Sequence, residues 1–432
     1  MQVSVEASAG LERRMRVQVP ADKIEQEVAA RLQKVGRRAK IKGFRPGKIP
    51  AKVVKQHYGG QVRQEVLQEI LQSSYSEAIM QEKLQPAGGP SIEPETLEEG
   101  KDLTYIAVFE VYPEFELKKL DKIKVQEPQA NISVEDIDTM LENLRKQRAD
   151  WTAVDRKAGD DDQVTVDFEG TLNGEPFEGG SAQEFPVVLG GGQMLADFEK
   201  NLKGMKAGDE KSFKMKFPKD YHAAELAGEK VEFAVKVSQV AEQALPELDE
   251  EFVKAYGIES GSLDDLRKDV EENLQRELEA KTRAEVKKQI LEGLLDTNPI
   301  ELPGVLVTQE CESLQKETMQ RMGITDENQA PAVDTFTETA EKRVRLGLLM
   351  SAVLQENELK VDQGRVTAKV DEICAPYENP EEIKNIYLQN PQFLGQIENM
   401  VLEEQVVEWL LEQAKVTSKN MKFKDLMELP AG

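Results

Sequence analysis

Residues 163–240 alternate apolar and polar side chains along much of their length, whereas the chain after about Leu245 repeats its apolar residues with a helical period. Alternation is typical of strands that bury one face, and the Asn173-Gly174 pair is a strong signal for a hairpin turn. One short helix, near residues 197–202, is expected to interrupt the strands. Because 432 residues exceed what one ordinary core holds, we predict two to four domains, one of them this strand-rich module.

The first 112 residues combine both patterns and predict a small α+β domain. Its expected elements are, in order, strands within 2–19, a helix opened by a capping box of Asp22 and Glu25, a short helix from Pro50 to Gly59-Gly60, a longer helix after it, and a strand at 103–112.

Residues 113–150 are predicted to be a linker that leads to the strand-rich module. They begin with a charged, irregular segment and contain a helix capped by Ser133 and Asp136. After the strand-rich module, the apolar residues repeat with a helical period from residue 246 nearly to the end of the chain. The first of these expected helices is long and is capped by Ser262. Further helices are expected at 305–322, 334–357, 362–375, 380–388 and 391–415. They are highly charged and thinly apolar, which suits extended arms better than a dense globule.

The charge is unevenly distributed along the chain. The whole chain has a formal net charge of −25, yet residues 1–60 contain 14 Lys and Arg against 5 Asp and Glu. A basic end on an acidic body indicates an anionic partner at that end, and a surface rich in nucleic acid fits. From the charge run alone, a solvated basic helix without a partner is the simpler explanation.

The sequence contains none of the common motifs for hydrolysis, phosphoryl transfer or metal binding. Cys311 and Cys374 lack the spacing of a thiolate metal site or a disulfide framework. The glycine run LGGGQ (189–193) lacks the third glycine of a dinucleotide-binding loop and is interpreted as a tight turn. No apolar run reaches the ~18–20 residues that span a bilayer. The N-terminus lacks a secretory pattern, so we expect a cytoplasmic protein. Because the motifs above are missing, we expect no cofactor.

Several motifs in residues 163–240 occur in the order found in one enzyme family. VDFEGTLNGEPFEGG, EFPVVLGGGQMLADFEKNLKGMKAGDEKSF, FPKDYHAAELAG and VEFAVKV resemble the FK506-binding family of peptidyl-prolyl isomerases. The resemblance implies a half-barrel sheet wrapped around a short helix, with a substrate pocket lined by aromatic residues. The residues that it assigns to catalysis in this pocket are Phe168, Phe177, Glu178, Phe185, Met194, Leu195, Phe198, Tyr221 and Phe233.

The resemblance also implies roles within the pocket. The backbone N–H of Leu195 and the hydroxyl of Tyr221 would donate to substrate carbonyls, and Phe198 stands at the floor, where the best-known members have Trp. Rotation about an X–Pro bond crosses a barrier of ~18–20 kcal/mol. An apolar pocket favours the twisted, less dipolar amide because it withholds water from the planar one. From the spacing alone, aromatics that form only a small barrel's core stay an alternative, as does a pocket that binds without catalysing.

The basic loop IKGFRPGKIP (41–50), followed by such a module, resembles the signature of the trigger factor family of bacterial ribosome-associated chaperones. In that family the loop docks on the large ribosomal subunit beside the exit tunnel and touches a ribosomal protein and rRNA. The positions that match the family pattern GFRxGKxP are Gly43, Phe44, Arg45, Gly47, Lys48 and Pro50, and Pro46 fills the variable position, where some members have Lys. For the loop in isolation, a turn that buries Phe44 in its own domain stays open.

This second resemblance spans the whole chain and implies a multidomain α+β protein. Its domains would be a small α+β ribosome-binding domain (1–112), a linker (113–150), a half-barrel isomerase domain (151–245) and an extended all-helical chaperone domain with arms (246–432). It implies an ATP-independent chaperone that holds emerging, unfolded polypeptides and needs no metal, cofactor or membrane. A homodimer off the ribosome is left open, as is a stand-alone isomerase whose helical part serves dimerisation or scaffolding.

Overall fold

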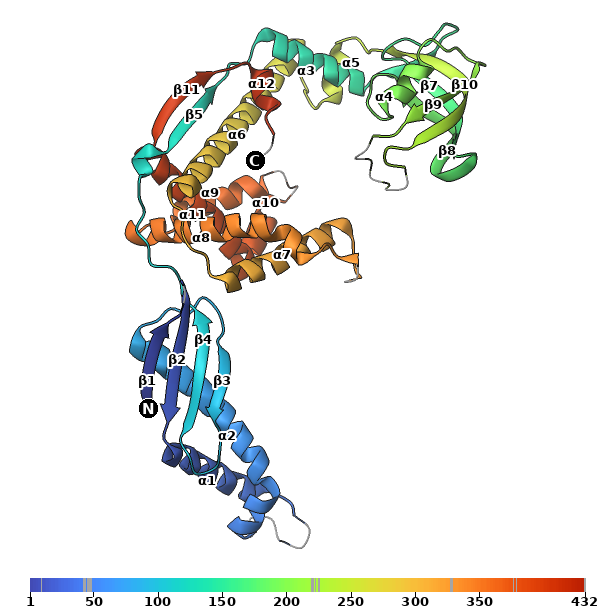
Figure 1. The fold of residues 1–432 in the computed structure, drawn as a ribbon. Helices are drawn as coiled ribbons and strands as arrows, with labels where there is room; N and C mark the ends of the chain where they lie inside the picture. Colours follow the sequence, from blue (N-terminus) through green and yellow to red (C-terminus); the bar gives the residue numbers. More distant parts are fainter. Residues whose placement is uncertain are drawn as a thin grey trace. The chain divides into compact units, whose positions relative to one another are not determined.

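The computed structural model of this chain describes residues 1–8, 10–41, 44, 49–218, 221, 223, 226–326, 329–375, 377 and 379–430. The chain divides into two units, which are Met1–Glu127 with Glu285–Ser418 and Pro128–Ala284 with Lys419–Gly432. Helices and sheets occur together along the chain, as expected for a mixed α+β protein (Figure 1). Within the described residues, no helix combines the length and the apolar character that a membrane crossing requires.

The first unit begins with a four-stranded antiparallel sheet in the order β1-β2-β4-β3. Its strands are β1 (Gln2–Ala7), β2 (Glu12–Val19), β3 (Ser91–Thr96) and β4 (Leu103–Glu110). Met15, Val17 and Val19 of β2 alternate onto the buried face, so the predicted strand pattern is confirmed. The sequence analysis missed β3, whose residues are mostly exposed.

Two helices, α1 (Ala21–Arg38) and α2 (Ala51–Glu82), pack on this sheet (Figure 1). The predicted capping box of Asp22 and Glu25 is wrong, because α1 begins at Ala21 and its N-cap makes no side-chain hydrogen bond. Instead the carboxylate of Asp102, just before β4, accepts a 2.8 Å hydrogen bond from the Ala21 N–H. A cap supplied from so far along the chain satisfies the helix end but leaves no local sequence signal.

The helix break predicted at Gly59-Gly60 is also wrong, since α2 runs unbroken from Ala51 to Glu82. A glycine in a helix costs about 1 kcal/mol relative to alanine. Val62 and Val66 on the next turns are buried in the domain core. Packing of this apolar stripe outweighs the intrinsic cost of the two glycines.

Two tyrosines in the core beneath this sheet differ in whether their hydroxyl groups have a hydrogen-bond partner. The Tyr105 hydroxyl lies 2.8 Å from the Ser74 hydroxyl, whereas the buried hydroxyl of Tyr75 has no hydrogen-bond partner among the described residues. A buried polar group without a partner costs about 1–3 kcal/mol. We therefore expect Tyr75→Phe to leave the free energy of unfolding unchanged or to raise it by up to about 1 kcal/mol. The matched change Tyr105→Phe should lower it by about 1 kcal/mol, as urea titration can measure.

Most of the remaining first unit is helical, and the predicted helices are confirmed to within a few residues. They are α7 (Gly304–Met322), α8 (Thr337–Glu356) after a 3-10 turn (Val333–Phe336), α9 (Gln363–Cys374), α10 (Pro380–Gln389) and α11 (Pro391–Gln413). The long helix α6 (Leu263–Thr297) precedes them and passes through the division between the units. Its C-terminal part packs Ile290 and Leu294 against α8 and α11.

One pair of strands within the region expected to be irregular or helical is missed by the sequence analysis. After a 3-10 turn (Leu120–Lys122), β5 (Lys124–Gln129) pairs with β11 (Lys415–Asn420). The Lys415 N–H donates to the Ile123 carbonyl at 2.8 Å. The side chain of Ile123 is buried in the hydrophobic core that α6 forms with α8 and α11. All residues of β11 are exposed, so the strand carries no alternating pattern to detect.

The second unit contains a helical cluster and an antiparallel five-stranded sheet. The cluster consists of α3 (Val134–Gln147), α5 (Glu250–Ala255), the start of α6 and α12 (Phe423–Met427). The capping box of Ser133 and Asp136 on α3 is confirmed. The sheet strands are β6 (Asp150–Ala153), β7 (Gln163–Leu172), β8 (Glu175–Val188), β9 (Glu210–Lys216) and β10 (Lys230–Ala244).

The sheet of the second unit is arranged around its longest strand, β10. One edge of β10 pairs with β7, which pairs with β8, and the other edge pairs with β9 and β6. The predicted hairpin turn at Asn173-Gly174 joins β7 to β8 with positive φ angles of 55° and 92°. The short helix α4 (Ala196–Leu202) buries Phe198 and Leu202 against the inner face of the sheet, as expected for a half-barrel.

Candidate functional site

The inner face of the half-barrel is lined by aromatic rings from three strands and from α4. Phe198 of α4 is 1% exposed, and its ring centroid lies 5.5 Å from that of Phe168 on β7 and 5.2 Å from that of Phe233 on β10. Phe168 also meets Phe185 of β8 edge-on at 6.0 Å. Edge-to-face packing of this kind holds each ring in place while leaving one end of the cluster open to solvent, where Phe185 is 38% exposed.

A hollow of ≈ 500 Å³ opens at this end of the cluster. Eight of the nine residues assigned by the sequence line it, namely Phe168, Phe177, Phe185, Met194, Leu195, Phe198, Tyr221 and Phe233. The ninth, Glu178, lies in β8, but its side chain is outside the described part of the structure. The volume is within the range of about 300–1,000 Å³ that small-ligand pockets occupy.

Two glycines make room for the rings that form one wall of the hollow. A Cβ at Gly170 would lie 2.7 Å from the Phe233 ring and 2.8 Å from the Phe177 ring, and a Cβ at Gly180 would lie 2.8 Å from the Phe177 ring. Any larger residue at either position would displace these rigid rings. The glycines of β7 and β8 therefore set the position of the wall.

The turn before α4 presents a backbone donor to the same hollow. The Glu199 carboxylate accepts hydrogen bonds from the Gly190 N–H at 2.9 Å and the Met194 N–H at 3.3 Å. Gly190 and Gly192 have φ angles of 88° and 67°, so the LGGGQ run is a tight turn, as predicted. None of the hydrogen bonds among the described residues uses the N–H of Leu195, which is the N-cap of α4. This N–H is therefore available to a ligand carbonyl.

Among the lining residues that the sequence analysis did not assign, three have large apolar side chains. Met215 and Phe217 of the β9 segment line it, as does Leu226. Phe217 supports Tyr221, with ring centroids 4.6 Å apart. The signal was present in FKMKF (213–217), where alternate residues face inward, but the resemblance alone did not extend the pocket to this strand.

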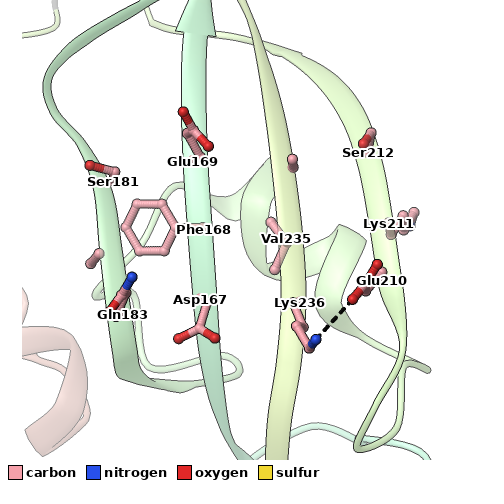
Figure 2. Close-up of a pocket in the computed structure, with 12 residues that line it drawn as sticks. Asp167, Phe168, Glu169, Ser181, Gln183, Glu210, Lys211, Ser212, Val235 and Lys236 are labelled. Carbon is pink, nitrogen blue, oxygen red and sulfur yellow. Dashed lines mark ion pairs between the residues drawn. The ribbon is translucent and has the colours of Figure 1, made fainter.

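The outer face of the same sheet carries a second, more open hollow of ≈ 680 Å³ (Figure 2). Figure 2 shows it lined mainly by polar side chains from four strands, including Asp167, Gln183 and Ser212. Lys236 and Glu210 form an ion pair across it at 3.0 Å. A polar, solvated surface cannot withhold water from an amide, so the aromatic hollow is the better candidate for the active site.

Of the assigned docking residues at 43–48, the structure describes only Phe44, and it also describes the helices on either side of the loop. Phe44 is 40% exposed, and its N–H donates to the Ile41 carbonyl at 3.1 Å. The other docking residues assigned by the sequence lie outside the described residues, namely Gly43, Arg45, Pro46, Gly47 and Lys48. Pro50 is the N-cap of α2 rather than its first residue.

Three family models match the sequence of this chain. Residues 1–144 match the bacterial trigger factor protein, residues 262–412 match the trigger factor C-terminus, and residues 154–238 match the FKBP-type peptidyl-prolyl cis-trans isomerase. The last match contains the aromatic hollow.

Proteins similar to this chain over nearly their whole length are also known. A trigger factor of Thioalkalivibrio sulfidiphilus is 48% identical over 99% of this chain and 98% of its own. One of Pseudomonas aeruginosa is 45% identical with the same coverage. A solved structure from work on promiscuous substrate recognition by the trigger factor chaperone covers 95% of this chain and 99% of its own, with a TM-score of 0.51 at 19% identity. That likeness shows a shared fold.

Proposed function

Because this chain belongs to the trigger factor family of ribosome-associated chaperones with a peptidyl-prolyl isomerase domain, we propose which of its residues catalyse isomerisation and which dock it on the ribosome. Members of this family are cytoplasmic and bind ribosomes and unfolded nascent polypeptides. The observation that carries the catalytic proposal is the convergence of eight sequence-assigned residues on one apolar hollow within the segment that matches the isomerase family.

The hollow acts by receiving the proline ring of an unfolded segment against Phe198. Its aromatic walls replace water around the X–Pro amide, and this destabilises the planar, more dipolar ground state relative to the twisted transition state. The Leu195 N–H and the Tyr221 hydroxyl hold the carbonyls on either side of the bond. No nucleophile or titrating base takes part, because rotation breaks no covalent bond.

The exposed position of Phe44 supports docking through the 43–48 loop. The Phe44 side chain is 40% exposed, so it is not packed in the hydrophobic core of its own domain. The loop carries Arg45 and Lys48 beside it in the sequence, so an apolar plug is flanked by cations. On the large ribosomal subunit, beside the exit tunnel, this combination meets a ribosomal protein and rRNA.

The remaining parts of the proposal follow from the family. Residues 1–112 are the ribosome-binding domain, 113–150 the linker, 151–245 the isomerase domain and 246–432 the chaperone domain with its arms. The chaperone domain holds clients without ATP through apolar groups scattered among charges, and releases them when they bury those groups. Part of the protein is bound to ribosomes, and the free pool contains monomers or homodimers.

Binding of the purified chain to empty ribosomes at several salt concentrations tests the docking proposal. We expect a steep loss of binding with salt. We expect the triple variant Phe44→Ala/Arg45→Ala/Lys48→Ala to bind at least about tenfold more weakly, equivalent to about 1.4 kcal/mol. Its isomerase activity on a short X–Pro peptide serves as the control and should equal that of the wild type. Unchanged co-sedimentation of the variant would count against the loop as the anchor.

A further inference from the structure

The longest stretch without acidic residues in the N-terminal domain extends well beyond the docking loop. Residues 28–64 contain no Asp or Glu and 11 Lys and Arg. The chain as a whole has 81 acidic residues in 432, so a gap of this length is unusual for it. The stretch covers the last part of α1, the loop and the first part of α2.

Several cations elsewhere in this domain are neutralised by ion pairs. Arg14 pairs with Glu93 at 2.9 Å and Arg16 with Glu95 at 2.8 Å, both on the sheet. Lys23, near the start of α1, lies 3.8 Å from Glu77. These cations therefore present little net charge to a partner.

A second group of cations is left without such partners. These residues, which we call the cationic patch, are Lys34, Arg37, Arg38, Lys40 and Lys52. All of them are exposed, and none of their side chains forms an ion pair or hydrogen bond with any residue that the structure describes. In contrast, Arg31 and Lys55, at the two edges of the patch, are paired with Glu69 and Glu99.

The packing of the two helices brings the patch together. A Cβ at Gly36 would lie 3.2 Å from a methyl group of Val54, so the last turns of α1 rest closely on the first turns of α2. Arg37 and Lys52 accordingly line one hollow of ≈ 620 Å³. Lys40 follows Ala39, the C-cap of α1, and leads into the docking loop.

We propose that the cationic patch binds the phosphate backbone of rRNA beside the docking loop, an inference that rests on the proposed ribosome docking. Unpaired cations from two helices, with no carboxylate among them, fit a surface of uniform negative charge. A nucleic acid backbone presents such a surface, with about one charge per 1.7 Å of axis in a DNA duplex. Protein surfaces mix both signs, so a protein partner would favour some acidic residues within the stretch.

Two variants of equal charge change test the patch. In the first, Lys34, Arg37 and Arg38 are replaced with Gln. In the second, the control, the paired cations Arg14, Arg16 and Lys23 of the same domain are replaced with Gln. Ribosome binding is measured from low to high salt for both variants, for the wild type and for Phe44→Ala, and circular dichroism with peptide isomerisation checks that each variant is folded.

For the patch variant, we expect the logarithm of the ribosome association constant to fall less steeply with the logarithm of the salt concentration, by about 2 in slope. Each of the three removed cations would account for one phosphate contact, and each contact contributes about 0.7–0.9 to the slope. The control variant should keep the wild-type slope within about 0.5. Irradiation of the wild type with ribosomes that contain 4-thiouridine should give rRNA crosslinks within residues 34–40.

The outcomes separate the two proposals. Absence of wild-type binding to ribosomes would overturn the docking proposal itself. If Phe44→Ala weakens binding but the patch variant and the control variant show the same salt slope, the patch proposal alone is overturned. Crosslinks that reach only the loop, or a patch that crosslinks only to ribosomal protein with bifunctional reagents, would overturn the assignment to RNA.

Discussion

Replacement of Phe198 with alanine is expected to abolish most of the isomerase activity of this chain and to destabilise its second unit. Phe198 is almost fully buried, and its ring meets those of Phe168, Phe213 and Phe233 at 5.2–5.6 Å. Removal of a buried phenylalanine ring costs about 3–5 kcal/mol, and the cavity would enlarge the floor on which the proline ring rests. We expect kcat/KM for a short X–Pro peptide to fall at least about tenfold, which corresponds to about 1.4 kcal/mol of transition-state stabilisation.

Phe213→Ala separates loss of the pocket floor from loss of stability. Phe213 belongs to the same aromatic cluster and is 8% exposed, but it is not among the residues that line the hollow. Its removal should destabilise the unit by a similar amount while leaving kcat/KM within about threefold at temperatures where both variants are folded. Urea unfolding and peptide isomerisation measure the two effects. Equal activity of Phe198→Ala and the wild type would refute the pocket assignment and favour a hollow that only binds.

The fold was predictable wherever its determinants are local. The capping box of Ser133 and Asp136 and the turn at Asn173-Gly174 each lie within a few residues of the structure that they specify. Long-range determinants were missed. Asp102 caps a helix that begins at Ala21, and β11 pairs with a strand almost 300 residues earlier. No local pattern encodes either contact, so propensity and spacing could not reveal them.

The candidate site was predictable because its aromatic residues occur within motifs that keep a fixed order along the chain. Eight assigned residues converge on the hollow, but their spacing alone is equally compatible with a core. The structure adds what spacing cannot show, which is an opening beside Phe185 and the placement of Phe217, just after β9, on its wall. The docking loop is the reverse case: its chemistry is explicit in the sequence, while of its residues at 43–48 the structure describes only Phe44.

Asp162→Asn is expected to destabilise the isomerase part of the chain strongly for a single polar substitution. Asp162 is 4% exposed, and its carboxylate accepts hydrogen bonds from Arg156 at 2.8 Å and from the Gly159 N–H at 2.7 Å. Loss of a partner from a buried pair costs about 3–5 kcal/mol. Because the Arg156 side chain is 46% exposed and can be hydrated again, we expect Asp162→Asn to lower the free energy of unfolding by about 2 kcal/mol.

The same interaction makes the stability depend on pH. Hydrogen bonds from Arg156, with the Gly159 N–H, hold the pKa of the Asp162 carboxyl below its ordinary value, against the opposing effect of burial. A lowered pKa in the folded state contributes stability that is present above the unfolded-state value of about 3.9 and is lost as the pH falls through the folded-state value. The wild type should therefore lose stability on acidification below about pH 4, and Asp162→Asn should show a shallower dependence.

The chain's two tryptophans allow this unit to be measured on its own. Trp151 lies on β6 of the sheet and Trp409 on α11 of the other unit, so a Trp409→Phe background leaves one reporter in the isomerase part. The matched control is Asp160→Asn, because Asp160 is 71% exposed and pairs with Lys203 in solvent. An exposed pair of this kind contributes less than about 1 kcal/mol. If both variants unfold at the same urea concentration at pH 7, the buried Asp162 contacts do not hold this part of the fold together.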